Sequence, residues 1–234
     1  MAVLEVSGLN VHYGKSHVVF DLDLKVEEGQ TIALLGRNGA GKTTTLMGIL
    51  GLLPGAQGGV NVNGRELARL PAHRRAQAGI AYMPSGARCF ANLTVAENLD
   101  IAARRGRSNG TAWNKARVYE TFPKLGELKA NLAGGLSGGE RQMLAMGRAL
   151  MSNPTVILMD EPTEGLAPVV VQSIARLVLE LKRTGVAIVL AEQNHQVALR
   201  VSDRAAFMEK GRIVEEMPAA EAVGSKLLGR ILGI

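Results

Sequence analysis

The sequence predicts an α/β fold with a mainly parallel core sheet, an N-terminal antiparallel β part and a helical insertion. The continuous apolar run at 31–35 and the largely apolar stretches within 155–162 and 185–193 are typical of strands buried on both faces of a sheet. In the N-terminal part, before residue 31, apolar residues alternate with polar ones, whereas residues 85–152 have helical spacing. Strands and helices that alternate on both sides of a helical stretch indicate a parallel sheet with an insertion.

The N-terminal part, residues 2–35, is expected to consist of short strands. In "DLDLKVEEG" the alternation puts Leu22, Leu24 and Val26 on one face. Residues 58–67 alternate again around an Asn-Gly pair, which is the strongest short-range signal for a hairpin turn. Antiparallel strands joined by tight turns are therefore expected in this part of the chain.

Two capping boxes mark helix starts in the middle of the chain. The box at 94–97 opens a helix that runs through about Arg104, and a further helix is expected over 111–121. The box at 137–140 opens a longer helix, which an Asn-Pro pair at 153–154 stops. This stretch predicts a helical subdomain.

After the insertion, strand and helix alternate again. An amphipathic helix is expected at 169–183 and a hairpin turning at Lys210-Gly211, followed by a short helical tail. All elements are expected to form one domain, 1–234. Its predicted parts are a nucleotide-binding α/β core (1–84 and 153–217), a helical subdomain (85–152) and a C-terminal helical tail (218–234).

The composition excludes some kinds of site and leaves others open. The single cysteine, Cys89, excludes an internal disulfide and a cysteine-based metal site. The net charge of +6 permits nucleic acid, an anionic membrane surface or phosphate ligands, and decides among none of them. The tight basic cluster at 104–107 is interpreted as a solvated loop. Without a signal-like N-terminus or an apolar run of about 20 residues, the chain is expected to be cytoplasmic.

"GRNGAGKT", Gly36 to Thr43, satisfies the P-loop pattern in the context that the pattern requires, between a buried strand and a helix. Its glycines let backbone N–H groups wrap around phosphates, and the helix N-terminus adds positive potential. Lys42 would reach the β- and γ-phosphates, and the Thr43 hydroxyl would bind Mg²⁺. The motif predicts a nucleoside triphosphate site.

The second half of such a site is "VILMD", 156–160, followed by Glu161. The apolar strand delivers two carboxylates at its carboxyl end, where open α/β sheets bind ligands. Asp160 would hold Mg²⁺, and Glu161 would act as general base toward the attacking water.

"LSGGE", 136–140, is another glycine-rich helix start, and a helix N-terminus of this kind is an anion site. Because the P-loop already supplies one phosphate cradle, a second one suggests a nucleotide held between two chains. In order and content, the P-loop, "LSGGE" and "VILMDE" resemble the ATP-binding cassette (ABC) ATPases over nearly the whole chain.

The resemblance implies a head-to-tail dimer in which each ATP lies between one P-loop and the signature "LSGGE" of the other chain. It also implies that Tyr13 stacks on adenine. The predicted catalytic residues are Glu161, Gln193 and Lys42, and the predicted metal ligands are Thr43 and Asp160. The predicted nucleotide-binding residues are Tyr13, Gly36, Arg37, Asn38, Gly39, Ala40, Gly41, Lys42, Thr43, Thr44, Ser137, Gly138 and Gly139.

"GLAP" at 165–168, "LAEQN" at 190–194 and "NLTVAENL" at 92–99 look like the cassettes of branched-chain amino-acid importers and of the similar urea or short-chain amide importers. Such a cassette is implied to be a homodimer, or a heterodimer with a sibling cassette, on the cytoplasmic face of the membrane. It would power a permease that a periplasmic or extracellular binding protein feeds with solute. The helical segment 85–130 would meet this permease.

Three residues depart from the general family pattern. Ser85 stands where most cassettes have glutamine, Ala167 replaces an aspartate, and Gln193 occupies the position of the switch histidine. Asn194 is then expected to cap the following helix, with His195 at its first position in an ordinary surface or packing role. Because an amide does not take up a proton as imidazole does, proton acceptance falls on Glu161.

Two other classes of function compete with an importer ATPase. A soluble ABC protein acting on DNA or ribosomes is expected to carry two cassettes or a long coiled coil, and this chain has one P-loop and no heptad run. A non-hydrolytic nucleotide switch would not need Glu161. The sequence therefore favours an ATP-hydrolysing importer subunit with ATP and Mg²⁺ as ligands and no nucleic-acid partner.

Overall fold

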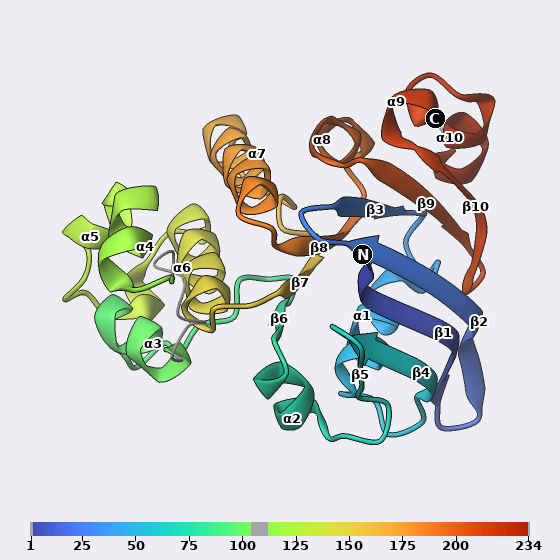
Figure 1. Ribbon diagram of the computed structural model, residues 1–234. Helices are drawn as coiled ribbons and strands as arrows, with labels where there is room; N and C mark the ends of the chain where they lie inside the picture. Colours follow the sequence, from blue (N-terminus) through green and yellow to red (C-terminus); the bar gives the residue numbers. More distant parts are fainter. Residues whose placement is uncertain (1, 104–111, 234) are drawn as a thin grey trace.

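The computed structural model describes residues 2–103 and 112–233, which form two β-sheets surrounded by helices (Figure 1). The strands are β1 (Ala2–Tyr13), β2 (Ser16–Glu27), β3 (Thr31–Leu35), β4 (Gln57–Val62), β5 (Arg65–Glu66), β6 (Ile80–Met83), β7 (Val156–Asp160), β8 (Ala187–Glu192), β9 (Arg204–Glu209) and β10 (Arg212–Pro218). One sheet is antiparallel, with the order β2-β1-β4-β5. The other has the order β10-β9-β3-β8-β7-β6 and is parallel except for β9 and β10.

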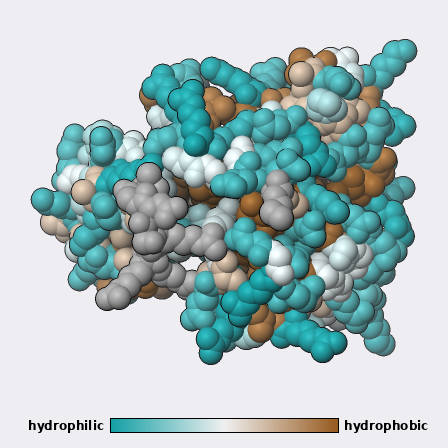
Figure 2. All heavy atoms as spheres, in the orientation of Figure 1, coloured by the Kyte–Doolittle hydropathy of each residue, from teal (hydrophilic) through white to brown (hydrophobic). Residues whose placement is uncertain are grey.

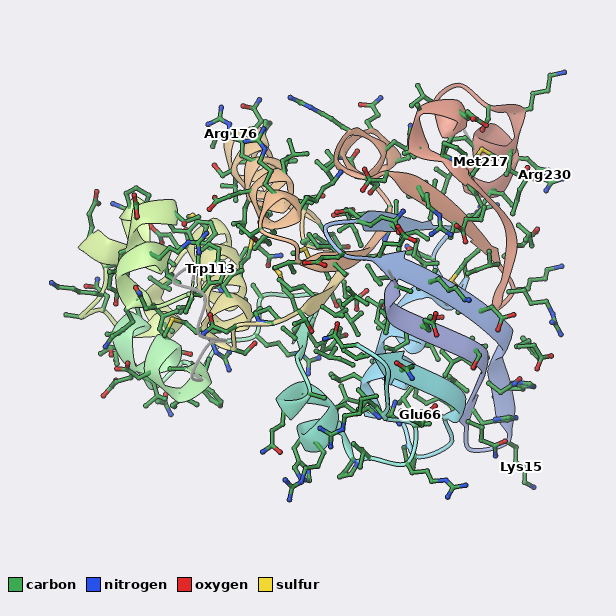
Figure 3. All side chains as sticks on the ribbon, viewed as in Figure 1. Lys15, Glu66, Trp113, Arg176, Met217 and Arg230 are labelled. Atoms are coloured by element: carbon green, nitrogen blue, oxygen red, sulfur yellow. The ribbon has the colours of Figure 1, made fainter. Side chains whose placement is uncertain are left out.

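The helices lie on both sides of the larger sheet (Figure 1). They are α1 (Lys42–Leu50), α2 (Ala72–Gln77), α3 (Val95–Ala102), α4 (Lys115–Thr121), α5 (Pro123–Glu127), α6 (Gly138–Met151), α7 (Pro168–Arg183), α8 (His195–Val201), α9 (Ala219–Ala222) and α10 (Lys226–Leu232), with a 3₁₀ turn at Ala133–Gly135. The helices α3 to α6 form a group that stands apart from the sheets. Trp113 lies in this group, whereas Glu66 and Lys15 mark the side of the antiparallel sheet (Figure 3).

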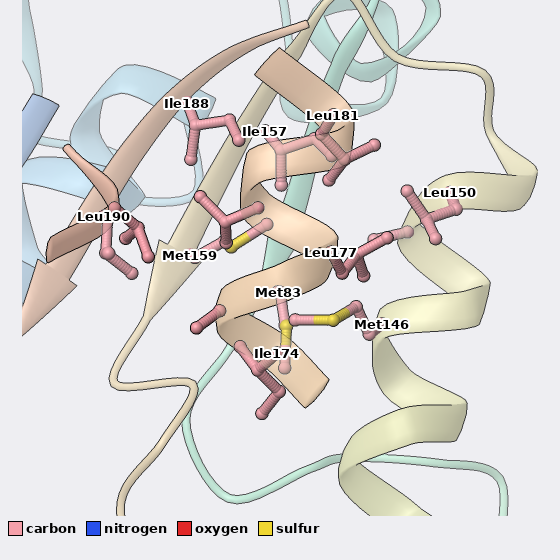
Figure 4. Packing of buried hydrophobic residues seen from close by; sticks show 14 of the residues in the cluster. Met83, Met146, Leu150, Ile157, Met159, Ile174, Leu177, Leu181, Ile188 and Leu190 are labelled. Carbon is pink, nitrogen blue, oxygen red and sulfur yellow. The ribbon is translucent and has the colours of Figure 1, made fainter. Parts of the chain in front are cut away.

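Two hydrophobic cores meet at the larger sheet because side chains of a strand alternate between its faces. In β3, Ile32 and Leu34 join the core shared with α1 and the antiparallel sheet. Ala33 and Leu35 join the core on the opposite face, which contains the helical group. In that second core α7 packs between strands β7 and β8 and helix α6 (Figure 4). Both faces of the central strands are thus covered, as their continuous apolar runs predict.

The predicted fold class is confirmed, and several element boundaries are corrected. The first two strands are 12 residues each rather than short, with irregularities in their register that let them bend. The expected helix at 111–121 begins at Lys115, because Asn114 caps it. The basic cluster at 104–107, the expected end of a helix at Arg104 and the expected helix start at Thr111 lie outside the described residues.

Three short elements, α2, β6 and α5, are not predicted from the sequence. The two capping boxes, the Asn-Gly hairpin turn and the hairpin at Lys210-Gly211 are present as predicted. Among residues 2–103 and 112–233 no helix is long and apolar enough to cross a membrane. The face of the molecule in Figure 2 is mostly hydrophilic, with apolar side chains gathered in a few places.

The buried Arg75 fixes the far end of α1. Its guanidinium donates to the carbonyls of Gly48 and Ile49 at the C-terminal end of that helix, and to those of Ala68 and Leu70 in the preceding loop. Carbonyls at a helix C-terminus have no partner within the helix, and a cation there complements the helix dipole. This contact holds in place the helix that begins at the P-loop.

Candidate nucleotide-binding site

The P-loop lies between the buried strand β3 and α1, and its backbone conformation requires glycine. Gly39 and Gly41 have φ values of 81° and 107°, which side chains disfavour. At Gly36 a Cβ atom would lie 2.5 Å from the Met208 carbonyl oxygen. The glycines of the motif therefore serve both the turn and its close approach to β9.

The β9–β10 hairpin supports this loop from outside. The Gly211 N–H donates to the Ala40 carbonyl at 2.9 Å, and the Gly211 carbonyl accepts from the Phe20 N–H at 2.9 Å. Gly211 itself has a φ of 79°, and a side chain there would collide with the Val18 carbonyl. The P-loop is thus tied to β2 through a hairpin far along the chain.

Lys42 begins α1 and is only 5% exposed. Its Nζ donates to the Gly36 carbonyl at 2.8 Å and lies 3.6 Å from Oε1 of Glu161. The ammonium group is therefore held inside the loop with a carboxylate as its counter-charge. A phosphate in this loop would meet a cation that is already oriented.

Asp160, at the end of β7, is fully buried. Its Oδ1 accepts from the Thr43 hydroxyl at 3.0 Å and its Oδ2 accepts from the Tyr82 hydroxyl at 3.2 Å. Burial raises the pKa of this carboxyl above its ordinary value, although both hydrogen bonds oppose the shift. Burial likewise raises the pKa of Tyr82, so its hydroxyl stays protonated and donates.

The hydroxyl of Thr43 and the carboxylate of Asp160 fit Mg²⁺ as ligands. A hydroxyl and a carboxylate are hard oxygen ligands, and Mg²⁺ is usually bound through one or two such groups together with substrate phosphates and water. In the described part of the chain no group of three or more His, Cys, Asp and Glu side chains could hold a metal. A cation at Thr43 and Asp160 would therefore depend on the phosphates of a nucleotide.

Glu161 follows Asp160 in a left-handed conformation, with a φ of 46°, which is uncommon for residues other than glycine. Its N–H donates to the Ala191 carbonyl at 2.8 Å, so the residue is fastened to β8. Its Oε1 accepts from the Gln193 side-chain amide at 2.9 Å. Backbone strain of this kind is found at functional sites, where surrounding contacts hold it.

The polar residues that end β8 take the positions that the sequence predicts. The Asn194 side chain accepts from the Val197 N–H at 3.2 Å and so caps α8, and His195 is the first residue of that helix. Gln193 is exposed and points its amide at Glu161. It is thus the side chain of Gln193, and not that of His195, that contacts the proposed base.

We expect Gln193→Ala to lower the ATP turnover number by about 10-fold to 100-fold, because it removes the amide that donates to Glu161, the predicted base. His195→Ala is the matched control and should leave turnover within about twofold, since such surface changes have small effects. Turnover measured from pH 6 to 8 should show no titration of a histidine at position 193, because that position carries an amide. If His195→Ala lost activity and Gln193→Ala did not, the assignment of the switch position to Gln193 would be wrong.

The structure does not bring every predicted residue together. Ser137, Gly138 and Gly139 lie at the start of α6, where Ser137 and Glu140 form the predicted capping box. Figure 1 shows α6 in the helical group, away from α1 and the P-loop of the same chain. Tyr13 lies at the end of β1 and is 48% exposed, with its hydroxyl 3.9 Å from the Met47 sulfur. An exposed ring beside α1 is open to stacking on a ligand.

Two neighbours of the predicted site residues, Tyr82 and Glu192, are not among the residues predicted from the sequence. Tyr82 contacts Asp160 from β6, a strand too short to stand out in the sequence. Glu192 is the last residue of β8, directly before Gln193, and it accepts hydrogen bonds from Thr163, two residues after Glu161. The signal for Glu192 is a charged residue that closes an apolar run.

The chain is similar to cassettes of several transporters. It is 40% identical over 232 residues to the high-affinity branched-chain amino acid transport ATP-binding protein BraG of Pseudomonas aeruginosa, covering 99% of this chain and 100% of the relative. It is 41% identical over 215 residues to the probable branched-chain amino acid transport ATP-binding protein LivF of Archaeoglobus fulgidus, covering 90% of each. It is also 34% identical to the lipopolysaccharide export system ATP-binding protein LptB of Haemophilus influenzae, over 99% of this chain and 97% of the relative.

The structure of this chain is also similar to solved structures of ATP-binding cassettes. A solved ATP-binding cassette of an ABC transporter, in its ADP conformation, matches with a TM-score of 0.80 at 26% identity, over 99% of this chain and 98% of that one. The family model described as "ABC transporter" matches residues 19–164, which include the P-loop, the signature and Asp160 with Glu161. With these matches and the P-loop geometry, the chain belongs to the ABC transporter family of ATP-binding cassettes.

Proposed function

We propose that this chain is the ATP-hydrolysing subunit of an importer for branched-chain amino acids. The observation that carries the proposal is the linked cluster in which Lys42 and Thr43 of the P-loop contact Glu161 and Asp160. These residues come from opposite halves of the sequence and converge at the carboxyl ends of β3 and β7, two strands of one sheet with β8 between them. Such ends are where open α/β sheets bind their ligands.

The chemistry is in-line attack of water on the γ-phosphate, which needs orientation and charge neutralisation more than covalent catalysis. The P-loop N–H groups and Lys42 would bind the phosphates. Glu161 would accept the proton of the attacking water as the water oxygen bonds to the γ-phosphorus and the bond from that phosphorus to the ADP oxygen breaks. Gln193 would orient Glu161 and the attacking water. Thr43 and Asp160 would hold Mg²⁺, which neutralises charge on the phosphates.

A second cassette would complete the site. Ser137 to Gly139 are exposed or half-buried at the N-terminus of a 14-residue helix. The Ser137 N–H donates to Glu140, so the backbone N–H groups of Gly138 and Gly139 are the ones that would face an anion. We infer that they meet the γ-phosphate of a nucleotide bound to the partner's P-loop, in a homodimer or with a sibling cassette. The exposed Tyr13 would stack on the adenine.

The permease would dock where the helical group meets the sheet. A groove of about 560 Å³ there has exposed apolar residues at its rim, namely Leu52, Phe90 and Ile101, which are 44%, 47% and 60% exposed. The Arg148 guanidinium lies 4.6 Å from the Phe90 ring centroid and keeps that ring in place. An apolar patch with a polar surround is typical of a protein-binding surface. Docked on its permease, the chain would work at the cytoplasmic face of the membrane, as the similarity to importer cassettes suggests.

The names of BraG and LivF favour branched-chain amino acids as cargo, and the local motifs are equally those of urea or short-chain amide importers. The test is ATP turnover by the chain assembled with its permease in lipid vesicles. Turnover should rise when the solute-binding protein loaded with leucine, isoleucine or valine is added. Stimulation by urea or a short-chain amide instead would show that these solutes, and not branched-chain amino acids, are the cargo. Stimulation by lipopolysaccharide would contradict import.

The single cysteine gives a direct test of the docking surface. Cys89 is half-buried and lines the groove beside Phe90. Its labelling by a maleimide should slow by about 10-fold or more when the permease is bound, as expected for a residue buried in an interface core. Cys89→Ser gives the unlabelled background, and Ile101→Asp should restore labelling in the mixture by preventing docking. Equal labelling with and without the permease would place the docking surface elsewhere.

A further inference from the structure

Glu192 is a buried carboxylate that the mechanism above leaves without a role. It ends β8 and is 2% exposed. Burial raises its pKa, and four hydrogen bonds to the carboxylate oppose that shift. A charge is costly to bury, so its partners indicate what it does.

The two oxygens of Glu192 bind two different loops. Oε1 accepts from the N–H and the hydroxyl of Thr163, at 2.9 and 2.6 Å. Oε2 accepts from the N–H groups of Gln193 and Asn194, at 3.1 and 3.3 Å. One carboxylate thus joins the loop that follows Glu161 to the loop that carries Gln193.

This arrangement requires a carboxylate in particular. All four contacts are donors, two on each oxygen, and an ionised carboxylate only accepts. A glutamine at this position has nearly the same shape but would turn an NH₂ group toward one of the two loops. The donors of that loop would then face another donor, which costs more than the loss of a neutral hydrogen bond.

The two loops hold the reacting groups at a short distance from each other. Gln193 and Glu161 are joined side chain to side chain at 2.9 Å, and the Glu161 N–H is fixed to Ala191. Gln193 is otherwise exposed, and a long exposed side chain has many rotamers. Its position relative to Glu161 therefore depends on how firmly its backbone is held.

We propose that Glu192 is a positioning residue for ATP hydrolysis, which fixes the backbone of Gln193 relative to Glu161 by binding both loops. The inference rests on the proposed ATPase function. It concerns the rate of the chemical step and not the binding of the nucleotide, because no atom of the P-loop contacts the Glu192 side chain in the described hydrogen bonds.

The test is the steady-state kinetics of ATP hydrolysis by the full chain with Glu192→Gln. We expect kcat to fall by about 10-fold and KM for ATP to stay within about twofold, the pattern of an interaction that serves the transition state. Val189→Ala is the matched control, since Val189 is fully buried in the same strand and away from both loops. It should lower the melting temperature and leave kcat unchanged.

A double-mutant comparison separates positioning from a merely structural role. Gln193→Ala should lower kcat in the wild-type background and have little further effect beside Glu192→Gln, because coupled residues are not additive. Thr163→Val removes one donor from Oε1 without leaving a new buried donor, and should lower kcat by about threefold even if Glu192→Gln folds poorly.

Three results would overturn the inference. The first is a wild-type kcat in Glu192→Gln, and the second is an additive effect of the two substitutions. The third is a loss of kcat in Val189→Ala that equals the loss in Glu192→Gln. Absence of ATP turnover in the wild-type assembly would instead overturn the proposed function, and this inference with it.

Discussion

Glu161→Gln should retain ATP binding and lose ATP turnover by about 10²-fold to 10⁴-fold, the usual contribution of a general base. Glutamine keeps the shape of the side chain and its contact with Gln193, but it cannot accept the proton of the attacking water. The Lys42 ammonium, which lies 3.6 Å from the carboxylate, would also lose its counter-charge. Nucleotide affinity should therefore stay equal or rise slightly.

Turnover and binding of ATP are measured separately for this variant, by phosphate release and by equilibrium binding. Glu215→Gln is the control, because it removes an exposed carboxylate on β10 that lies in a different element from Lys42 and Glu161. The charge of Glu161 is the main cause that raises the pKa of Glu164, so that pKa should fall in Glu161→Gln. Unchanged turnover in Glu161→Gln would remove this residue from the role of base.

Asp160→Asn should abolish Mg²⁺-dependent turnover and at the same time raise the melting temperature by about 2–4 °C. An asparagine can still accept from the Thr43 hydroxyl, and the Tyr82 hydroxyl can accept from its amide, so the buried hydrogen bonds remain. The charge is lost, and with it both the magnesium ligand and the cost of burying an ionised group.

The sign of the stability change follows from the pKa of Asp160. Burial raises this pKa above the unfolded value of 3.8, so the folded protein binds the proton more tightly than the unfolded chain. The group therefore contributes stability below pH 3.8, and this contribution is lost as the pH rises through the folded pKa. At pH 7 the ionised carboxylate destabilises the protein, and Asp160→Asn removes that penalty.

Melting curves of wild type and Asp160→Asn at several pH values test this account. The difference in melting temperature should be largest at neutral pH and shrink as the pH falls through the raised pKa of Asp160, because the wild-type carboxyl then becomes protonated. Asp203→Asn is a control of opposite sign, because the Asp203 carboxylate is half-exposed and pairs with the Lys182 ammonium at 2.8 Å. A lower melting temperature for Asp160→Asn at pH 7 would contradict the cost assigned to the buried charge.

The sequence predicts features that depend on residues close together in the chain. The P-loop, the capping boxes at Thr94 and Ser137 and the cap at Asn194 all form within a few residues, so their motifs suffice. Strands buried on both faces are visible as apolar runs for the same reason. Local patterns leave open the presence of a very short element such as β6 and the exact start of one such as α4, since few residues define them.

Contacts between distant segments were decided by the tertiary structure alone. The hydrogen bonds from Tyr82 to Asp160, from Thr163 to Glu192 and from Gly211 to Ala40 join residues 29 or more positions apart. They exist because the strand order sets β6 beside β7, β7 beside β8 and β9 beside β3, and no local pattern specifies that order. The sequence by itself determined which residues could bind and hydrolyse a nucleotide. Only the packing of the sheet decided which side chains hold these residues in contact with one another, because those contacts depend on the pairing of strands that are far apart in the sequence.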